Sequence, residues 1–151
     1  MTERFKLIPE VFLILIKDGK VLLSRRANTG YMDGHYGLVA GHAEEHEPMR
    51  TALAREAKEE AGITINPQNL RHIVTIHRYC PDPENIHERI GFYFTTDSWK
   101  GEILNTEPDK CDDLSWFPIS DLPHNTIDYV KEAIGCFVSG QSYLEFGFDH
   151  A

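Results

Sequence analysis

Three glutamates that could form a cation site, together with an arginine, occur close together in residues 41–63, which read GHAEEHEPMRTALAREAKEEAGI. On a helix, Glu56 and Glu60 project together because they are four residues apart, and Glu59 lies beside Glu56 at the i,i+3 spacing. Like charges at this spacing destabilise a helix unless something offsets their repulsion. Several carboxylates without a thiolate suit Mg²⁺ or Mn²⁺ rather than Zn²⁺. These glutamates therefore predict a divalent cation site, and Arg55 is the natural partner to orient them.

The residues around the glutamates predict the helix that would position them. Pro48 suits a first helical turn, where its missing N–H costs little, and Gly62 suits the C-terminal exit. One apolar stripe repeats at about 100° per residue: Met49, Leu53, Ala57 and Ala61. Glu60 falls on the edge of this stripe, where a carboxylate is costly unless it is paired or binds a metal. A solvated acidic face with Arg55 paired to Glu59 is the simpler alternative, but the position of Glu60 favours a cation site.

A second metal motif overlaps the first. Residues 42–46 fit H-x-x-E-H, the inverted zinc-protease signature. Zinc binding would need His42 and His46 on one helical face, with a third ligand downstream. Gly41 precedes this segment and Pro48 follows it, so the sequence favours a helix that begins after the motif. We expect two loop histidines near an acidic site.

Written as a pattern, residues 41–63 are G-x5-E-x7-R-E-A-x-E-E-x-G-I, which resembles the Nudix box of the Nudix hydrolases. Members of that family cleave nucleoside diphosphates linked to another group, so the resemblance implies a Mg²⁺-dependent enzyme, with Mn²⁺ as the alternative, acting on a small-molecule nucleotide. It also implies an α/β fold, the Nudix-type α/β/α sandwich with a mixed central sheet. In that fold the box forms a loop–helix–loop on one side of the sheet. We expect residues 1–151 to form a single Nudix domain.

The resemblance extends outside the box to the MutT-type members of the family. Residues 21–26 look like their second strand, in which an arginine at the position of Arg26 contacts the nucleotide; an exposed strand-end arginine is the alternative. Residues 105–117 resemble a segment of the MutT-like nucleoside triphosphate diphosphatases of animals and plants. The implied reaction converts a ribo- or deoxyribonucleoside triphosphate to the monophosphate and pyrophosphate. ADP-ribose, nucleotide sugars and dinucleoside polyphosphates stay open as substrates, as does a non-catalytic nucleotide sensor on the same fold.

The resemblance also implies roles for individual residues. Glu56 and Glu60 would hold the metal, helped by Glu59 and by the backbone carbonyl of Ala40. The family usually has Pro-Gly-Gly before the box, where this chain has Val39-Ala40-Gly41, so Ala40 must tolerate backbone angles suited to glycine. Gly41 and Arg26 would contact the substrate, and Arg55 would support the glutamates. For the proton acceptor we favour Glu59, with Glu60 or a loop acid as the alternative. The loop candidates are Glu88, Glu107, Asp112 and Asp113.

Composition limits the partners of this chain of 151 residues. Its net charge of −9 disfavours binding to nucleic-acid polymers and anionic membranes. The three cysteines (Cys80, Cys111 and Cys136) form no C-x-x-C pair and read as reduced thiols of a cytoplasmic protein. The longest apolar run, residues 11–16, is too short to span a bilayer. Whether the protein is a monomer or a homodimer stays open.

The remaining residues predict further strands, turns and a second helix. Strands are expected at residues 11–16, 21–24, 37–40, 73–79, 90–95 and 114–118. A hairpin turn at 17–20, an exposed loop at 28–34, a turn-rich segment at 80–85 and a helix at 127–138 complete the pattern. Five aromatic residues could stack on a base, although strand aromatics more often belong to the core: Phe12, Tyr36, Phe92, Phe94 and Trp116. Residues 141–148 read as a last edge strand, a dimer contact or a lid.

Overall fold

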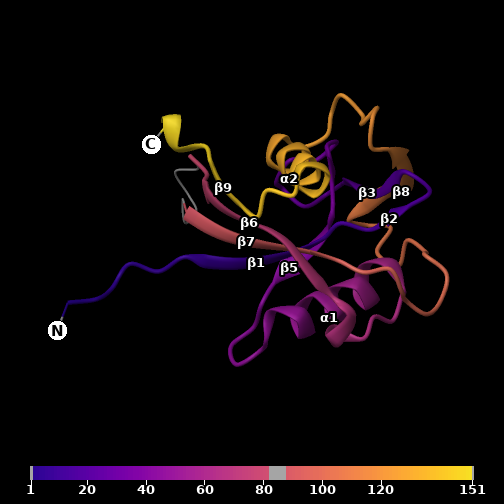
Figure 1. Cartoon of the computed structure of the whole chain (residues 1–151), viewed down its shortest axis with the longest axis horizontal. Helices are drawn as coiled ribbons and strands as arrows, with labels where there is room; N and C mark the ends of the chain where they lie inside the picture. The colour runs from indigo at the N-terminus through magenta and orange to yellow at the C-terminus, as the bar shows by residue number, and fades with distance from the viewer. Residues whose placement is uncertain (1, 82–87, 151) are drawn as a thin grey trace.

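The fold is built on a five-stranded mixed sheet (Figure 1). The structure is a computed structural model that describes residues 2–81 and 88–150. The strands follow the order β5-β1-β7-β6-β9 across the sheet. They are β1 (Ile8–Leu13), β5 (Val39–His42), β6 (Arg71–Tyr79), β7 (Glu88–Thr95) and β9 (Tyr143–Phe146). The β1–β7 and β6–β9 pairs are parallel, whereas the β1–β5 and β6–β7 pairs are antiparallel. The predicted mixed central sheet is therefore confirmed.

A second, smaller sheet is centred on β3. Its strands are β2 (Ile16–Lys17), β3 (Lys20–Arg26), β4 (Tyr36–Gly37) and β8 (Cys111–Pro118), and β3 pairs with each of the other three in antiparallel register. The turn between β2 and β3 has φ values of 54° at Asp18 and 74° at Gly19. Two successive positive φ angles are typical of the tight turns that match the twist of a hairpin. The predicted hairpin at residues 17–20 is confirmed.

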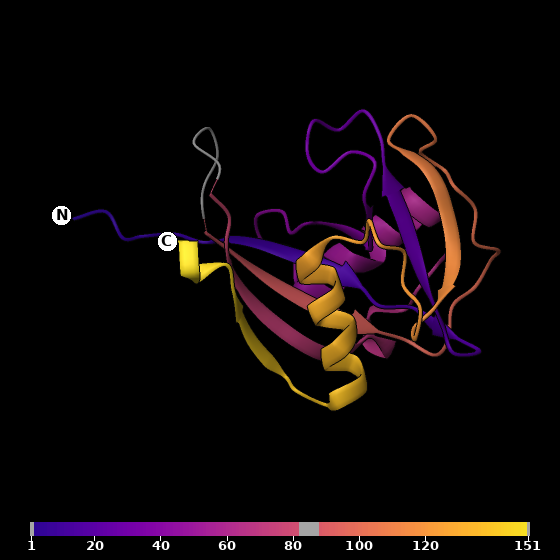
Figure 2. The ribbon, with the colours of Figure 1, turned by 90° about the horizontal axis from the view of Figure 1, so that it is seen from above.

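Helices α1 (Met49–Ala61) and α2 (Asp128–Ser139) cover opposite faces of the large sheet (Figure 2). The side chains of β1 and of the residue after it explain why both faces are covered, because successive residues of a strand point to opposite faces. Phe12 and Ile14 belong to the core cluster that contains the apolar residues of α2. Val11 and Leu13 belong to the cluster that contains the apolar residues of α1. This arrangement is the predicted α/β/α sandwich.

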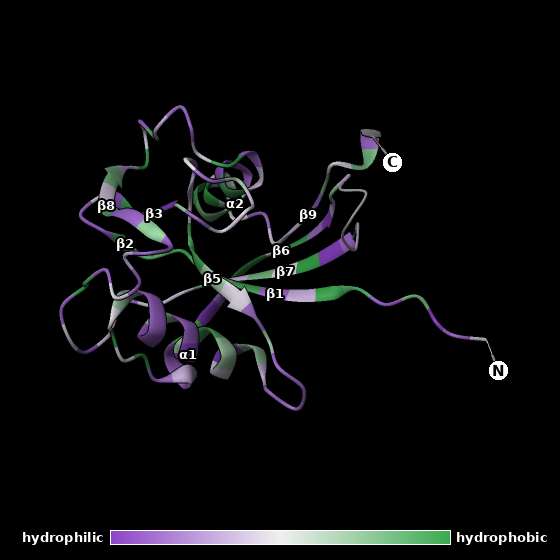
Figure 3. Ribbon diagram, turned by 180° about the vertical axis from the view of Figure 1, so that it is seen from behind, coloured by the Kyte–Doolittle hydropathy of each residue, from purple (hydrophilic) through white to green (hydrophobic). Residues whose placement is uncertain are grey.

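The helix predicted from the glutamate-rich segment forms as α1. Pro48 immediately precedes it, and Gly62 ends it with a φ of 70° and donates its N–H to the Lys58 carbonyl at 3.2 Å. The residues of α1 that are fully buried against the sheet are Ala52, Leu53, Ala57 and Ala61. The rest of the helix is largely hydrophilic (Figure 3). The expected stripe is confirmed in its last three positions, while Met49 is only partly buried.

Two predicted strands are each divided between the two sheets. The run 11–16 leaves the large sheet after Leu13 and enters the small sheet at Ile16, and the run 37–40 is divided between β4 and β5. Residues 11–15 are buried on both faces, so no polar residue marks the point where the chain changes sheet. The other predicted strands and the second helix lie within two or three residues of their expected bounds. Positions 82–85 of the turn-rich segment lie outside the described residues.

The C-terminal segment contributes β9, an edge strand that pairs in parallel with β6. Two short 3₁₀ turns, η1 (Pro67–Asn69) and η2 (Phe148–His150), complete the fold. All three cysteines are free thiols, and two of them, Cys111 and Cys136, are buried. Within residues 2–81 and 88–150, neither helix has the length and apolar character needed to cross a membrane.

Candidate active site

A cavity of about 670 Å³ opens between the two sheets and α1. Its walls come from both helices and from strands β1, β3, β5, β6, β7 and β8, together with the loop at residues 28–31 and the segment 107–111. This volume lies within the range of small-ligand sites. The cavity therefore brings together side chains from parts of the chain that are far apart in sequence.

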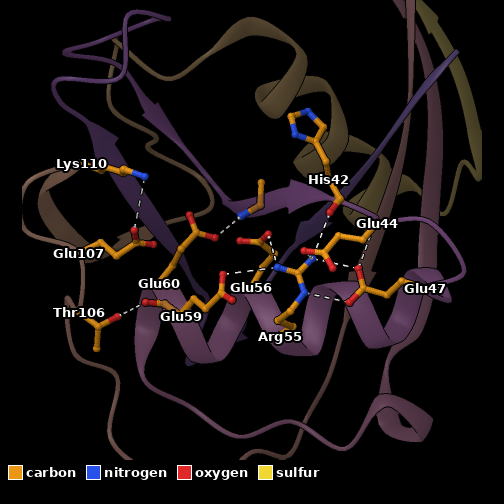
Figure 4. Close-up of polar contacts among 11 residues, drawn as sticks. His42, Glu44, Glu47, Arg55, Glu56, Glu59, Glu60, Thr106, Glu107 and Lys110 are labelled. Carbon is orange, nitrogen blue, oxygen red and sulfur yellow. Dashed lines mark hydrogen bonds and ion pairs between the residues drawn. The ribbon is translucent and has the colours of Figure 1, made fainter.

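Glu60 faces this cavity from the last turn of α1 (Figure 4). One of its carboxylate oxygens accepts a hydrogen bond from the backbone N–H of Ala40 at 3.1 Å. Burial, reinforced by the nearby charges of Glu56 and Glu107, raises the pKa of Glu60 to about 9. A nearby cation would favour the ionised form of this carboxyl group.

Glu56 lies one helical turn earlier, against the backbone of β5. A β-carbon added at Gly41 would collide with the carboxyl group of Glu56, so glycine is needed for Glu56 to keep this position. Arg55 donates to the Glu56 carboxylate at 2.9 Å, yet burial still raises the pKa of Glu56. Gly41 thus has a steric reason to be glycine, independent of any contact with substrate.

Arg55 is held by several acceptors at once. Its guanidinium donates to both oxygens of Glu47 at 2.9 Å and to the His42 carbonyl at 3.2 Å, besides Glu56. The hydrogen bonds from Arg55 lower the pKa of Glu47 to about 2. Two parallel N–H···O bonds fix a guanidinium in orientation as well as position. Arg55 therefore ties the loop before α1 to the carboxylate of Glu56.

Glu59 occupies a different place from the other two box glutamates. Its side chain is 52% exposed, it is not part of the cavity lining, and it lies 3.5 Å from Arg55 Nη1. The segment after Leu104 docks on this end of α1: Leu104 donates to the Ala61 carbonyl at 3.0 Å, and the Thr106 hydroxyl donates to the Glu59 carbonyl. This docking carries Glu107 into the cavity lining, 3.9 Å from Lys110 Nζ.

The four loop acids proposed as additional bases lie in different places. Of these four described residues, only Glu107 lines the cavity. Glu88 pairs with His77 at 3.0 Å, Asp112 pairs with Arg25 at 2.6 Å, and Asp113 accepts from the hydroxyls of Tyr36 and Ser115.

A divalent cation fits the acidic end of the cavity only with help from the backbone and the substrate. In the described part of the chain, no three His, Cys, Asp or Glu side chains are arranged as a complete ligand set. Glu56 and Glu60 offer two carboxylates that repel one another, and this repulsion is what a cation would relieve. Ala40 is not among the described residues with positive φ, so alanine presents its carbonyl without backbone strain.

Basic side chains face the same cavity. Arg26 donates to the Tyr31 carbonyl at 2.7 Å and to the Thr29 hydroxyl at 3.2 Å. Arg78 is only 5% exposed, pairs with Glu10 at 2.8 Å, and lies 4.0 Å from the ring centroid of Tyr129. A pocket that combines carboxylates with arginines suits a polyanion bridged by a metal.

The family model of the NUDIX domain matches residues 6–134, which include the acidic helix, the small sheet and every strand of the large sheet except β9. The chain belongs to the Nudix family.

Relatives with curated names and solved structures agree with this assignment. The NAD-capped RNA hydrolase NudC of Pseudomonas entomophila is 30% identical over 119 residues, covering 78% of this chain and 39% of that protein. The chain spans less than half the length of the curated relatives it matches. A MutT NUDIX hydrolase from Burkholderia pseudomallei is similar in fold, with a TM-score of 0.77, 24% identity, and coverage of 87% of this chain and 98% of that one. A MutT protein from Methanosarcina mazei Go1 gives a TM-score of 0.74 at 17% identity, covering 91% and 97%.

Most of the Nudix residues singled out in the sequence meet in the cavity: Arg26, Ala40, Gly41, Glu56 and Glu60. Arg55 and Glu59 lie behind it on α1. Sequence reasoning missed Glu10, Tyr31, Arg78 and Tyr129, which also line the cavity. Arg78 carried a usable signal, because it follows Val74 and Ile76 at the alternate, buried positions of β6. A charged residue on the inner face of a strand is a candidate for function.

The structure argues against the zinc alternative from the sequence and leaves one aromatic candidate for base stacking. Residues 43–48 are not helical, and His46 is 90% exposed, so His42 and His46 do not share a helical face as zinc binding would require. Of the five aromatic residues considered for base stacking, only Phe12 lines the cavity, and the others pack in the two cores.

Proposed function

We propose that this Nudix domain, formed by residues 1–151, is a hydrolase that cleaves a phosphoanhydride bond of a nucleotide, with Mg²⁺ or Mn²⁺ as its cofactor. Its preferred reaction converts a nucleoside triphosphate to the monophosphate and pyrophosphate. The observation that carries this proposal is the placement of Glu56, Glu60 and the Ala40 backbone in one cavity with Arg26 and Lys110.

Several residues of the chain would have separate roles in the proposed hydrolysis. Glu56 and Glu60 would hold the cation together with the Ala40 carbonyl, and Arg55 would keep Glu56 in place through its 2.9 Å hydrogen bond. When bound, the cation supplies charge neutralisation of the diphosphate and lowers the pKa of a bound water. Arg26 would bind the nucleotide phosphates, as it lines the cavity with a fixed guanidinium. Gly41 would leave the substrate and Glu56 room beside β5.

For the proton acceptor we propose Glu59. Its half-exposed side chain is held by a long 3.5 Å contact with Arg55, so a change of rotamer toward the cavity costs little, and it could then also contribute to the metal. Glu107 is the alternative, because it already faces the cavity and lies beside Glu60. A general base must come within hydrogen-bond reach of the proton that it accepts.

A second candidate is hydrolysis of the central diphosphate of a NAD-type dinucleotide. It is favoured by the curated relatives named as NAD-capped RNA hydrolases, at 25–30% identity. The net charge of −9 argues against a long RNA partner but not against the dinucleotide itself. ADP-ribose and nucleotide sugars carry the same linkage and belong in the same test. A nucleotide sensor would bind these compounds without releasing product.

The test is product release from a panel of nucleoside triphosphates, NADH, ADP-ribose, nucleotide sugars and dinucleoside polyphosphates. Each compound is incubated with Mg²⁺, with Mn²⁺ and with a chelator. Glu60→Gln removes one ligand, whereas Glu132→Gln makes the same change on the exposed side of α2 and serves as the control. We expect metal-dependent cleavage that Glu60→Gln lowers by orders of magnitude and Glu132→Gln leaves unchanged. Nucleotide binding without any product would overturn the proposal in favour of a sensor.

A further inference from the structure

An ionic cluster, buried except for its exposed member His42, lines the cavity and takes no part in the proposed hydrolysis. Glu10 on β1 accepts hydrogen bonds from Arg78 at 2.8 Å and from Arg89 at 3.1 Å. His42 lies 3.5 Å from the same carboxylate and 3.2 Å from Arg89. We name these four residues the arginine cluster. Its members come from β1, β5, β6 and β7, so the fold assembles it from four neighbouring strands.

Within the described residues, the arginine cluster contains more positive than negative charge. One carboxylate, that of Glu10, faces two guanidinium groups whose side chains are 6% and 19% exposed. Burial acts to raise the pKa of Glu10, but the hydrogen bond with His42 and the charges of Arg78 and Arg89 outweigh it and hold this pKa below its usual value. The nearby acid Glu88 is engaged by His77 instead. An uncompensated charge in a site shielded from water is costly, which makes a bound anion favourable.

The aromatic side chains beside the cluster do not supply the missing negative charge. The Tyr129 hydroxyl exchanges a hydrogen bond with the Tyr31 hydroxyl at 3.3 Å, and burial raises the pKa of Tyr129 well above its usual value. Tyr129 is therefore a neutral phenol whose ring lies 4.0 Å from the Arg78 guanidinium. This stacking fixes the guanidinium plane, and Arg78 also donates to the Tyr31 hydroxyl at 3.4 Å.

We propose that the arginine cluster binds a phosphate group of the substrate that is separate from the diphosphate held at Glu56 and Glu60. This inference rests on the proposed function, because it adds a second anchoring point in the same cavity. Within the described residues, both contacts of Arg89 use Nη1, and Arg89 lines the cavity in which the substrate would bind. A guanidinium binds phosphate through two parallel hydrogen bonds, and a neutral nucleobase would leave the extra charge uncompensated.

Two sources of such a phosphate are chemically equivalent at this site. The first is the terminal phosphate of a nucleoside triphosphate, and the second is a phosphate on the ribose of a dinucleotide. GTP and GDP differ by the first group, and NADPH and NADH differ by the second. The ratio of kcat/KM within each pair therefore isolates the contribution of that one phosphate.

The variant for this test is Arg89→Gln, because Arg89 is more exposed than Arg78 and its replacement disturbs the core less. Arg89→Lys keeps the charge, and Arg71→Gln makes the same charge change at the exposed start of β6. We expect Arg89→Gln to lower the GTP/GDP ratio or the NADPH/NADH ratio by about tenfold, as expected for a hydrogen bond to a charged group. Arg89→Lys should recover part of that loss, and Arg71→Gln should leave both ratios unchanged.

The ratio that falls identifies the source of the phosphate. If the protein hydrolyses these compounds and Arg89→Gln changes neither ratio, the inference is wrong while the proposed function stands. If the wild-type protein hydrolyses none of them with Mg²⁺ or Mn²⁺, the proposed function fails for these substrates, and direct binding decides the inference. Titration with inorganic phosphate, followed by ³¹P NMR without metal, should then show affinity about tenfold weaker in Arg89→Gln than in Arg71→Gln. Equal affinities would overturn the inference.

Discussion

Gly41→Ala should damage the metal site without damaging the fold. The new β-carbon would stand 2.6 Å from Cγ of Glu56 and closer still to its carboxyl group, where ordinary contacts begin at 3.4 Å. Glu56 must therefore move by about 1 Å, and a displacement of that size in a catalytic group costs on the order of 10²-fold in rate. Glu56 also accepts a hydrogen bond from Arg55 at 2.9 Å. The displacement would weaken this hydrogen bond, which orients the carboxylate.

The assay compares kcat/KM for the best substrate with Mn²⁺ affinity, measured by electron paramagnetic resonance, and with thermal unfolding. Gly135→Ala is the matched control, because Gly135 lies in α2 and a β-carbon there meets nothing within 4 Å. It should leave activity unchanged and stabilise the protein by roughly 0.5–1 kcal/mol, as alanine does in a helix. Activity and Mn²⁺ affinity of Gly41→Ala within threefold of wild type would refute the steric role of Gly41.

Three further predictions concern ionisable groups of the site. Glu59→Gln should lower kcat by about 10²–10⁴-fold and Glu107→Gln by roughly tenfold or less, and the reverse order in steady-state kinetics would transfer the base role to Glu107. Because Glu60 has a pKa of about 9 without a cation, it is protonated at pH 7.5, and Mg²⁺ binding there should release about one proton. Calorimetry in two buffers of different ionisation enthalpy measures this release, which should vanish in Glu60→Gln. Glu47 has a pKa of about 2 in the folded protein, below its ordinary value of 4.5, so its pairing with Arg55 stabilises the fold above pH 4.5 and is lost as the pH falls toward 2. The loss of unfolding free energy in Glu47→Gln, measured with urea, should therefore be larger at pH 7 than at pH 2.5, and an equal loss at both would contradict it.

The acidic helix could be predicted from the sequence because its signals are local. Pro48, Gly62 and a stripe at the helical period lie within one short segment and need no knowledge of the rest of the chain. The positions at which the chain passes from one sheet to the other could not be predicted. Residues 11–15 are buried on both faces, so alternation gives no sign of where the chain leaves one sheet for the other.

The arginine cluster could not be predicted for a related reason. Glu10 and Arg78 are 68 residues apart in sequence, and their pairing depends on how β7 lies between β1 and β6. In the sequence, Arg78 only breaks the apolar alternation that Val74 and Ile76 begin. The box defines where a metal and a diphosphate would bind, but the residues that would select the rest of the substrate come from strands whose order the sequence does not reveal.

The distribution of charge connects the two ends of the cavity with the choice of substrate. Among the described residues, the lining contributes four carboxylates and four basic side chains, so the net charge of −9 lies on the rest of the molecule. One bound divalent cation would make the cavity positive, whereas the rest of the molecule would keep its net negative charge. A compact polyphosphate can place all of its charge inside, where both the cation and the arginines compensate it. A long nucleic acid would bring many more phosphates to a protein of net charge −9, so we propose that small nucleotides, or at most the end of a chain, are the preferred substrates.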